Sequence, residues 1–502
     1  MRQSRLLPLI IATALFMENT DSTVIATSLP MIAQSLGEDP IALKLALTAY
    51  LVSLAIFIPV SGWMADRFGA RTIFRAAIGV FMVGSLACAA ANSLTGFVLA
   101  RFLQGMGGAM MVPVGRLVIL RSVPRNELVQ ALATLTIPAL IGPVLGPPLG
   151  GFITTYLSWR WIFFINIPIG VAGIILATLF VPDIREDNTP PLDWLGFILS
   201  GVGLALLMLG FATGGRHLIP IEVSVGCVVV GALSLGAYVR HAGRTPYPLI
   251  QLRLFKIPTF MISVVGGSLF RVGVGAIPFL LPLMLQVGFG LSPVQSGSLT
   301  FISAVGALFS KASTKKMLEF VGFRTLLTVN AVVGSAFVAI NGLFTPATPY
   351  WLIMPLLFLG GWFRSLQFTS LNAIAYADIS NRDMSYATSL SGAVQQLSLS
   401  IGVALGAFAL ETAAAWHGDA GIAARDFAPA FVTVAVVSAL SAFFFTRLTA
   451  QAGADLSGHR NVNAQTPSTG LGDGMEAAVG GTISQTAKNR GDVHGPEDHR
   501  PL

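Results

Sequence analysis

The sequence predicts an all-α protein that crosses a membrane many times, and three observations carry this prediction. Hydrophobic residues make up 54% of the 502 residues and charged residues only 11%, whereas soluble domains carry about 25% charged residues. The mean hydropathy is +0.75, and long apolar runs follow one another along the chain. The 53 glycines suit membrane helices, which tolerate glycine better than soluble helices do. This composition excludes a set of soluble domains.

The apolar runs divide the chain into fourteen predicted spans. A helix needs about 20 apolar residues to cross about 30 Å of hydrocarbon. With this length as the criterion, the spans fall at residues 6–30, 44–64, 74–93, 96–120, 129–154, 159–181, 191–213, 219–239, 258–287, 294–311, 323–344, 350–376, 385–414 and 427–449. The first run leads into further spans without a small-residue cleavage site, so we expect no cleaved secretion signal. Cys88 and Cys227 lie in apolar runs, which predicts no disulfide framework.

The positions of Lys and Arg predict the orientation of these spans, because cytoplasmic loops carry an excess of both residues. With a cytoplasmic N-terminus, most basic residues of the loops and span ends fall on the cytoplasmic side. Only Lys44, Arg160, Arg216 and Arg425 fall outside. An even number of spans then places both termini in the cytoplasm. This placement explains the net charge of +7, and we expect no nucleic-acid partner.

The chain changes character after Arg447. Residues 451–502 are polar and rich in Gly, Asp, Ser and Thr, which predicts a disordered cytoplasmic tail. The tail histidines, His459, His494 and His499, lack the spacing of metal ligands. We therefore expect neither a metal site nor a cofactor.

Distinctive motifs mark the first six spans. Span 1 holds FMENTDSTVIATSLP at residues 16–30, with two acids in an apolar run. The loop after span 2 reads GWMADRFGARTIF at 62–74, which puts a charged cluster at the cytoplasmic face. Span 4 contains RFLQGMGG at 101–108, and span 5 contains GPVLGPPLGGF at 142–152. Span 6 opens with WRWIFFINIPIG at 159–170, an aromatic interfacial belt.

These stretches, in this order and spacing, resemble the major facilitator superfamily, and more closely its fourteen-span drug:proton antiporters of the EmrB/QacA type. In the first span, Asp21, Thr23 and Pro30 are in register with the family's motif. The resemblance covers residues 16–170 well, and the C-terminal half matches only in pattern. It implies the major facilitator fold, with two six-helix bundles and two additional linking helices. The implied domains are 1–181, 182–240 and 241–450, followed by the tail 451–502.

The resemblance also implies roles for two motifs. The cytoplasmic loop motif is read as a gate, in which Asp66 would meet the N-terminal end of span 13 near Ser385, where the helix dipole attracts an acid. Its residues are Gly62, Asp66, Arg67, Gly69 and Arg71. The family's antiporter motif in span 5 is a bend typical of exporters, although close helix packing is the simpler explanation. Its residues are Gly142, Pro143, Gly146, Pro147, Gly150 and Gly151.

An internal repeat supports two related halves. FGARTIF at 68–74 recurs as VGFRTLL at 321–327, which aligns Gly69 with Gly322. The second copy lacks the acid of Asp66. Parallel repeats of this kind suit alternating access about a site near the midplane.

Ionisable residues inside spans are rare and usually face a cavity or each other. Glu18 and Asp21 are three residues apart and share one helix face. At 1.5 Å per residue, Asp21 and Arg101 lie about 13 Å and about 8 Å below the outer ends of their spans, so the two can interact. We favour proton coupling by Asp21, Glu18 and Arg101 over a structural ion pair or cap. Family register favours Asp21 as the proton carrier, and depth favours Glu18.

Two further arginines lie near span centres. Arg271 and Arg364 cannot easily reach the membrane surface, so we expect them to face a substrate cavity together with Asn19 and Gln104. Two such cations would suit an anionic or zwitterionic substrate, which qualifies the cationic drugs expected of the family.

The sequence as a whole predicts a proton-coupled antiporter in the bacterial inner membrane that exports hydrophobic or amphiphilic compounds, including drugs. Its partners would be a small-molecule substrate, protons and the lipid bilayer, with a monomer favoured and accessory periplasmic or outer-membrane proteins left open. The nearest alternative is a dedicated exporter or importer of one anionic or zwitterionic metabolite. A non-transporting membrane sensor or scaffold acting through the tail is an alternative of another class. An enzyme is not expected, since no nucleophile–base pair occurs in the spans.

Overall fold

The computed structural model describes residues 2–122, 128–186, 189–213, 220–380, 383–418 and 422–454. Every regular element within these ranges is a helix. Most of the predicted tail, including its three histidines, lies outside the described residues, as do the side chains of Pro143 and Ser385.

The N-terminal part of the chain contains eight α-helices. They are α1 (Arg2–Val24), α2 (Leu29–Leu36), α3 (Lys44–Phe68), α4 (Ala70–Ala90), α5 (Leu94–Ser122), α6 (Leu128–Tyr156), α7 (Trp161–Phe164) and α8 (Asn166–Phe180). Two helices follow, α9 (Trp194–Thr213) and α10 (Ile221–Ala242). The remaining helices are α11 (Pro258–Leu283), α12 (Pro293–Ile340), α13 (Tyr350–Ala375), α14 (Met384–His417), α15 (Phe427–Ala439) and α16 (Ser441–Phe445).

Eleven helical segments of the described residues are long and apolar enough to cross a membrane, so the chain is a multi-pass membrane protein. Each predicted span coincides with a helical segment, although the boundaries differ. The largest difference concerns α12, which continues about ten residues beyond the expected end at 311. An ion pair between Lys315 and Glu319, four residues apart, supports this extension. Gly322, at φ 71°, then breaks the helix between the two expected spans.

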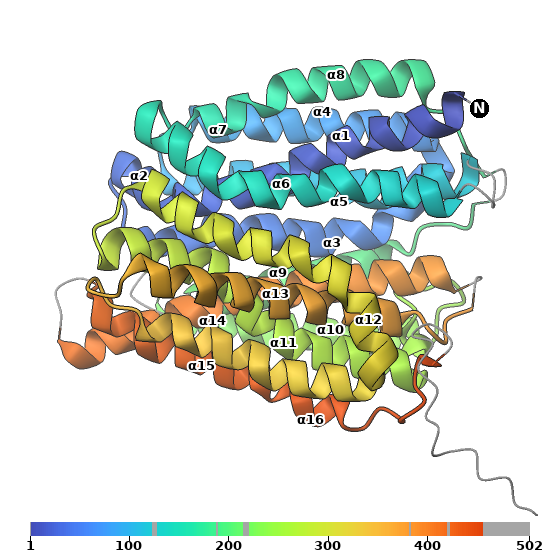
Figure 1. Cartoon of the computed structure of the whole chain (residues 1–502). Helices are drawn as coiled ribbons and strands as arrows, with labels where there is room; N and C mark the ends of the chain where they lie inside the picture. Colours follow the sequence, from blue (N-terminus) through green and yellow to red (C-terminus); the bar gives the residue numbers. More distant parts are fainter. Residues whose placement is uncertain are drawn as a thin grey trace, which may run out of the picture. The chain divides into compact units, whose positions relative to one another are not determined.

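The helices form two groups that meet along four helices. In the first group, α1 packs on α6 and α8, and α5 packs on α3 and α4. In the second group, α11 packs on α14 and α15, and α12 packs on α13. The groups meet where α6 contacts α12 and where α3 contacts α14 (Figure 1). The helices α9 and α10 pair with each other, and α9 covers α3 and α14 at this junction.

A large apolar cluster joins the two groups at one end. We call the end where α1 begins the inner end and the opposite end the outer end. One buried apolar cluster at the outer end combines Leu29 and Phe97 of the first group with Phe279 and Leu410 of the second. Toward the inner end, separate clusters serve each group, one around Phe74 and others in the second group. The groups therefore share a large buried cluster at the outer end, whereas toward the inner end each group also has clusters of its own.

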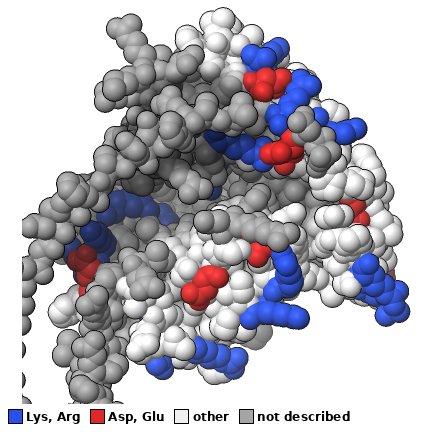
Figure 2. Space-filling model, turned by 90° about the vertical axis from the view of Figure 1, so that its right-hand side faces the viewer, with Lys and Arg blue, Asp and Glu red and all other residues white. Residues whose placement is uncertain are grey.

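Charged side chains gather at the inner end. Figure 2 looks onto this face and shows Lys and Arg together with Asp and Glu across it. Arg67 and Arg75 are exposed there, and two ion pairs, Arg121–Asp66 and Arg253–Asp383, lie on the same side. This distribution agrees with the Lys and Arg pattern from which the orientation is predicted.

Candidate functional site

A buried polar network surrounds Asp21 at the centre of the first helix group. The Arg101 guanidinium of α5 donates to Asp21 Oδ2 at 2.7 Å. Gln104 Nε2 and Asn166 Nδ2 donate to Asp21 Oδ1 at 2.9 and 2.8 Å. Both amides also donate to Ser85 Oγ of α4. Asp21 is only 2% exposed and Arg101 only 1%, so four helices enclose a compensated charge pair.

Glu18 lies beside this network but has a different partner. The Tyr50 hydroxyl of α3 donates to Glu18 Oε1 at 3.2 Å. The Tyr50 ring also lies under the Arg101 guanidinium, whose Cζ is 4.3 Å from the ring centroid. Tyr50 therefore connects the two acids of α1, one through its hydroxyl and the other through Arg101.

Glycines of α5 make this close approach of helices possible. A Cβ on Gly105 would lie 2.7 Å from the backbone oxygen of Tyr50, and one on Gly107 would lie 2.5 Å from the backbone nitrogen of Phe81. A Cβ on Gly108 would lie 3.0 Å from the Tyr50 hydroxyl. The glycines of RFLQGMGG thus let α3 and α4 approach α5 closely enough to enclose Arg101.

The glycines of α6 hold the other side of α1. A Cβ on Gly142 would meet Thr20, and one on Gly146 would meet Thr23. Gly150 faces the backbone of Val24, while Gly151 faces Pro293 at the start of α12. The motif therefore packs α6 against both helix groups, in line with the close-packing explanation.

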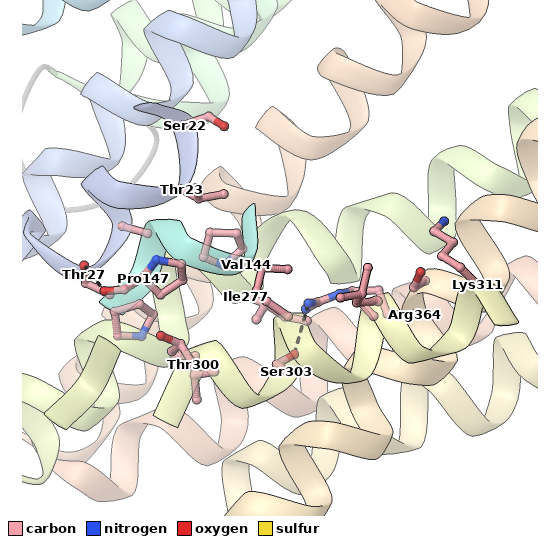
Figure 3. A pocket seen from close by; sticks show the side chains of 18 residues that line it. Ser22, Thr23, Thr27, Val144, Pro147, Ile277, Thr300, Ser303, Lys311 and Arg364 are labelled. Atoms are coloured by element: carbon pink, nitrogen blue, oxygen red, sulfur yellow. Dashed lines mark hydrogen bonds between the residues drawn. The ribbon is translucent and has the colours of Figure 1, made fainter. Parts of the chain in front are cut away.

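A cavity of about 240 Å³ lies between the two helix groups. Its wall includes Ser22 and Thr23 of α1, Val144 and Pro147 of α6, and Ile277 of α11 (Figure 3). The rest of the wall comes from α11, α12 and α13, and it is mostly apolar. The antiporter motif and the helix of Asp21 thus both contribute to the cavity.

Two cations line this cavity, and both come from the second helix group. Arg364 of α13 donates through Nη2 to Ser303 Oγ at 3.1 Å. Lys311 of α12 is exposed and donates to Thr369 Oγ1. Within the part of the chain that the structure describes, neither residue forms an ion pair.

The other residues expected in a substrate cavity lie elsewhere. Gln104 is fully buried in the Asp21 network, because its amide bridges Asp21 and Ser85. Asn19 is turned to its own helix, donating to the Leu15 carbonyl at 2.8 Å, and is not among the residues that line the cavity. Arg271 is 2% exposed, donates to Asn372 Oδ1 at 3.3 Å and is likewise not among the residues that line the cavity.

The loop motif at residues 62–74 is tied to the segment that follows α8. Asp66 accepts from Arg121 at 2.7 Å, and Arg121 also pairs with Glu186. Gly69 has φ 94°, and a Cβ there would collide with the Asp183 carboxylate. Arg67 is exposed and Arg71 is partly exposed, while Gly62 has open space beside it. In this conformation Asp66 is held inside the first helix group, and its expected contact near Ser385 stays a prediction.

Polar contacts seal the outer end between the two groups. Lys44 at the start of α3 and Glu411 near the end of α14 form an ion pair at 2.7 Å, with side-chain exposures of 1% and 7%. Gln286 donates to the Thr27 carbonyl at 2.7 Å, and Val294 N donates to Thr155 Oγ1 at 3.2 Å. Together with the shared apolar cluster, these contacts close the outer end.

Several of these residues have no role that the sequence pattern indicates. The Lys and Arg pattern places Lys44 on the outer side and Lys311 on the cytoplasmic side without assigning either a function, and Glu411 has no motif of its own. Tyr50 and Ser85 carry no pattern of their own within apolar helices. Asn166 stands in the quoted motif of span 6, which was the one available signal for its role.

Comparison with known proteins agrees with this arrangement. A family model for the Major Facilitator Superfamily matches residues 11–403. MdtD of Escherichia coli (strain K12) and MdtD of Shigella boydii serotype 18 (strain CDC 3083-94 / BS512) are each 37% identical over 443 residues, which cover 88% of this chain and 93% of the relative. Their name classes both with multidrug resistance.

Solved transporters share the fold at low identity. A D-xylose–proton symporter has a TM-score of 0.61 at 15% identity, covering 88% of this chain and 96% of its own. The nucleoside transporter NupG has a TM-score of 0.59 at 14% identity, covering 88% and 98%. The low-identity structures show only the fold, whereas the family match and the relatives at 37% identity show the family. The chain belongs to the Major Facilitator Superfamily and is a membrane transporter of small molecules rather than an enzyme.

Proposed function

We propose that this chain is a proton-driven antiporter that exports hydrophobic or amphiphilic compounds across the bacterial inner membrane. In this proposal fourteen spans form two six-helix bundles, at 1–181 and 241–450, with residues 182–240 as two linking helices. Both termini lie in the cytoplasm, so the inner end faces the cytoplasm. The name of the MdtD relatives supports export of drugs, and the apolar cavity wall supports an amphiphilic substrate.

The observation that carries the proposal is the Asp21 network beside a cavity that α1 itself lines. The donors of Arg101, Gln104 and Asn166 cover both carboxylate oxygens of Asp21. Protonation of Asp21 removes the negative charge that these donors compensate, so it weakens the hydrogen bond from Arg101 above all and favours its withdrawal. Proton binding and a shift between α1 and α5 or α8 are therefore coupled, which is what an antiporter requires.

Because the outer end is sealed, the proposed transport cycle starts from a conformation that a substrate enters at the inner end. In the conformation described here, a substrate enters the cavity from the cytoplasm while an acid of α1 releases its proton. Rearrangement opens the outer end, and the substrate leaves. A proton from outside then binds Asp21 or Glu18 and favours the return. Glu18 is the second candidate carrier, because among the described residues Tyr50 is its hydrogen-bond donor, so fewer contacts must break for a proton to reach Glu18 than to reach Asp21.

A transport assay tests the proton assignment. Purified full-length protein in proteoliposomes would be given an outside-acidic or matched pH, and efflux of a panel of fluorescent amphiphiles of either charge would be measured. We expect Asp21→Asn to abolish gradient-driven transport and Glu18→Gln to reduce or abolish it. Glu222→Gln is the matched control, because Glu222 is an exposed acid in the first turn of α10.

The outcome that contradicts the proposal is specific. If Asp21→Asn, Glu18→Gln and the double variant all transport with an unchanged response to the gradient, neither acid couples protons to transport. Retained folding of each variant would be checked by gel filtration, so that loss of transport is not confused with loss of protein.

A second candidate function is the export of one anionic or zwitterionic metabolite. The observation that favours it is the pair of cations in the cavity wall, Arg364 and Lys311, without an acid among the lining residues. A screen that finds one strongly preferred anion and no transport of other amphiphiles would support this candidate over a broad exporter.

A further inference from the structure

We propose that Arg364 and Lys311 form a binding site for the anionic head group of an amphiphilic substrate, with the apolar cavity wall holding its body. This inference rests on the proposed function, since it names the substrate class of the same cavity. Such a site differs from one that binds cationic drugs. It predicts that the transporter selects its substrates first by charge and then by shape.

The cavity wall is positively charged. Eighteen described side chains line the cavity, and the charged ones among them are Lys311 and Arg364. Asp21 and Glu18 do not belong to this lining, because both point into the network between α1, α3 and α5. Among the described lining residues, a ligand therefore meets positive charge, and a cationic ligand would find no counter-ion among them.

These two cations have N–H donors without a partner among the described residues. A guanidinium offers a planar fork of several N–H donors that matches a carboxylate, sulfonate or phosphate. Arg364 uses one of them on a neutral partner, the Ser303 hydroxyl, at 3.1 Å (Figure 3). Arg101, by contrast, is fully enclosed and pairs directly with Asp21. A cation held in a membrane protein without an acid is costly, and a bound anion would offset that cost.

The two cations lie at different depths along the cavity. Ser303, the partner of Arg364, and Lys311 are eight residues apart on α12, or about 12 Å along the helix axis. Lys311 is on the side of the inner end, because α12 runs from the outer toward the inner end over this stretch. An anion entering from the inner end therefore meets the exposed Lys311 first and Arg364 deeper in.

Most of the cavity wall around the two cations is apolar. Val144, Ile277, Leu281 and Leu308 line the same cavity and offer no hydrogen bonds through their side chains. Hydroxyls from Ser22, Thr23 and Thr300 supply a limited polar edge. A charged head and an apolar body on one molecule match these two surfaces, whereas a small hydrophilic anion would use only one of them.

A binding experiment tests this inference without any gradient. The full-length protein in phosphatidylcholine nanodiscs would be titrated by calorimetry with naphthalenesulfonate and with naphthyltrimethylammonium, which share the ring system and differ in charge. We expect the sulfonate to bind and the cation to bind at least about tenfold more weakly. Arg364→Gln should weaken sulfonate binding by about tenfold to a hundredfold, and Lys311→Gln by less.

Matched variants keep the result interpretable. Arg364→Lys retains a charge and should keep part of the affinity, which separates charge from folding. Lys315→Gln removes a cation from the same helix, where the side chain is 87% exposed and outside the cavity lining, and should leave binding unchanged. Equal binding of the two probes by the unaltered protein, or full sulfonate affinity in Arg364→Gln, would overturn the inference.

Two sources could supply the anionic head group, a free amphiphile or an anionic lipid. Adding phosphatidylglycerol to the discs distinguishes them. Competition with naphthalenesulfonate would assign the site to a lipid head group, and unchanged sulfonate affinity would assign it to a free amphiphile. None of these binding measurements uses a proton gradient. Sulfonate binding can therefore be found even if the transport assay shows no proton coupling, and proton coupling can be found even if the sulfonate does not bind.

Discussion

The two charged centres of the transporter differ in how their charge is compensated. Around Asp21, every carboxylate oxygen has a donor, and the Arg101 cation has its acid at 2.7 Å. In the cavity wall, Arg364 has only the Ser303 hydroxyl within the described residues. In the first centre the protein itself supplies the opposite charge, whereas in the second the opposite charge is missing among the described residues.

This difference suggests a division of labour between the helix groups. A complete network changes only when a proton or a rearrangement disturbs it, so it suits coupling. An incomplete cationic wall changes when a ligand supplies the missing charge, so it suits recognition. The Lys44–Glu411 pair is a third case, because it is complete but joins the two groups. Its integrity depends on the outer end staying closed.

The largest effect that the comparison predicts is on stability. Removing one partner of a buried ion pair typically costs about 3–5 kcal/mol, because the other charge stays buried and uncompensated. Arg101→Met should therefore lower the free energy of unfolding by this amount, whereas Arg364→Met should be close to neutral or stabilising. Unfolding by denaturant in detergent micelles, followed by circular dichroism, measures both.

A double variant checks the cause. Arg101→Met combined with Asp21→Asn removes both charges, and it should be more stable than Arg101→Met alone. If Arg364→Met proves as destabilising as Arg101→Met, the two centres are not different in kind and the comparison fails.

The next effect concerns the outer seal. Glu411→Gln leaves the Lys44 ammonium buried beside a neutral amide, which weakens a charged hydrogen bond of about 1.5–3 kcal/mol. The population of the outward-open conformation should then rise by about tenfold or more. Spin labels at Ser158→Cys and Thr345→Cys, placed on exposed sites of the two groups after Cys88→Ala and Cys227→Ala, would report the opening as a longer distance.

Glu38→Gln is the control for this measurement, because Glu38 is an exposed acid in the same outer region. An unchanged distance distribution in Glu411→Gln would mean that the apolar cluster alone holds the outer end closed. The pair would then be a consequence of closure rather than a contributor to it.

Much of the fold could be predicted from the sequence because span length and glycine placement are local properties. The repeat that aligned Gly69 with Gly322 is a clear case, since both glycines adopt positive φ, at 94° and 71°. A turn that needs this conformation selects glycine wherever it occurs. The long extension of α12 was missed because its polar residues resemble a loop, although they continue the helix.

The site was harder to predict because it depends on which way each helix is rotated. Gln104 was expected in the cavity and instead completes the Asp21 network. Lys311 was counted as a cytoplasmic loop charge, yet it lines the cavity. Contacts of this kind join residues far apart in sequence, such as Lys44 and Glu411, and no local pattern encodes them.

The smallest predicted effect sharpens the comparison within the first centre. Tyr50→Phe removes the hydroxyl that donates to Glu18 but keeps the ring beneath Arg101. Loss of one hydrogen bond should lower the free energy of unfolding by about 0.5–1.5 kcal/mol, well below the effect of Arg101→Met.

If Glu18 carries the transported proton, Tyr50→Phe should also shift the pH at which gradient-driven efflux is half-maximal. If Asp21 alone carries it, the pH profile should stay in place, because the donors to Asp21 are untouched. Efflux from proteoliposomes across a pH series would therefore decide which acid of α1 moves the proton, without removing either of them.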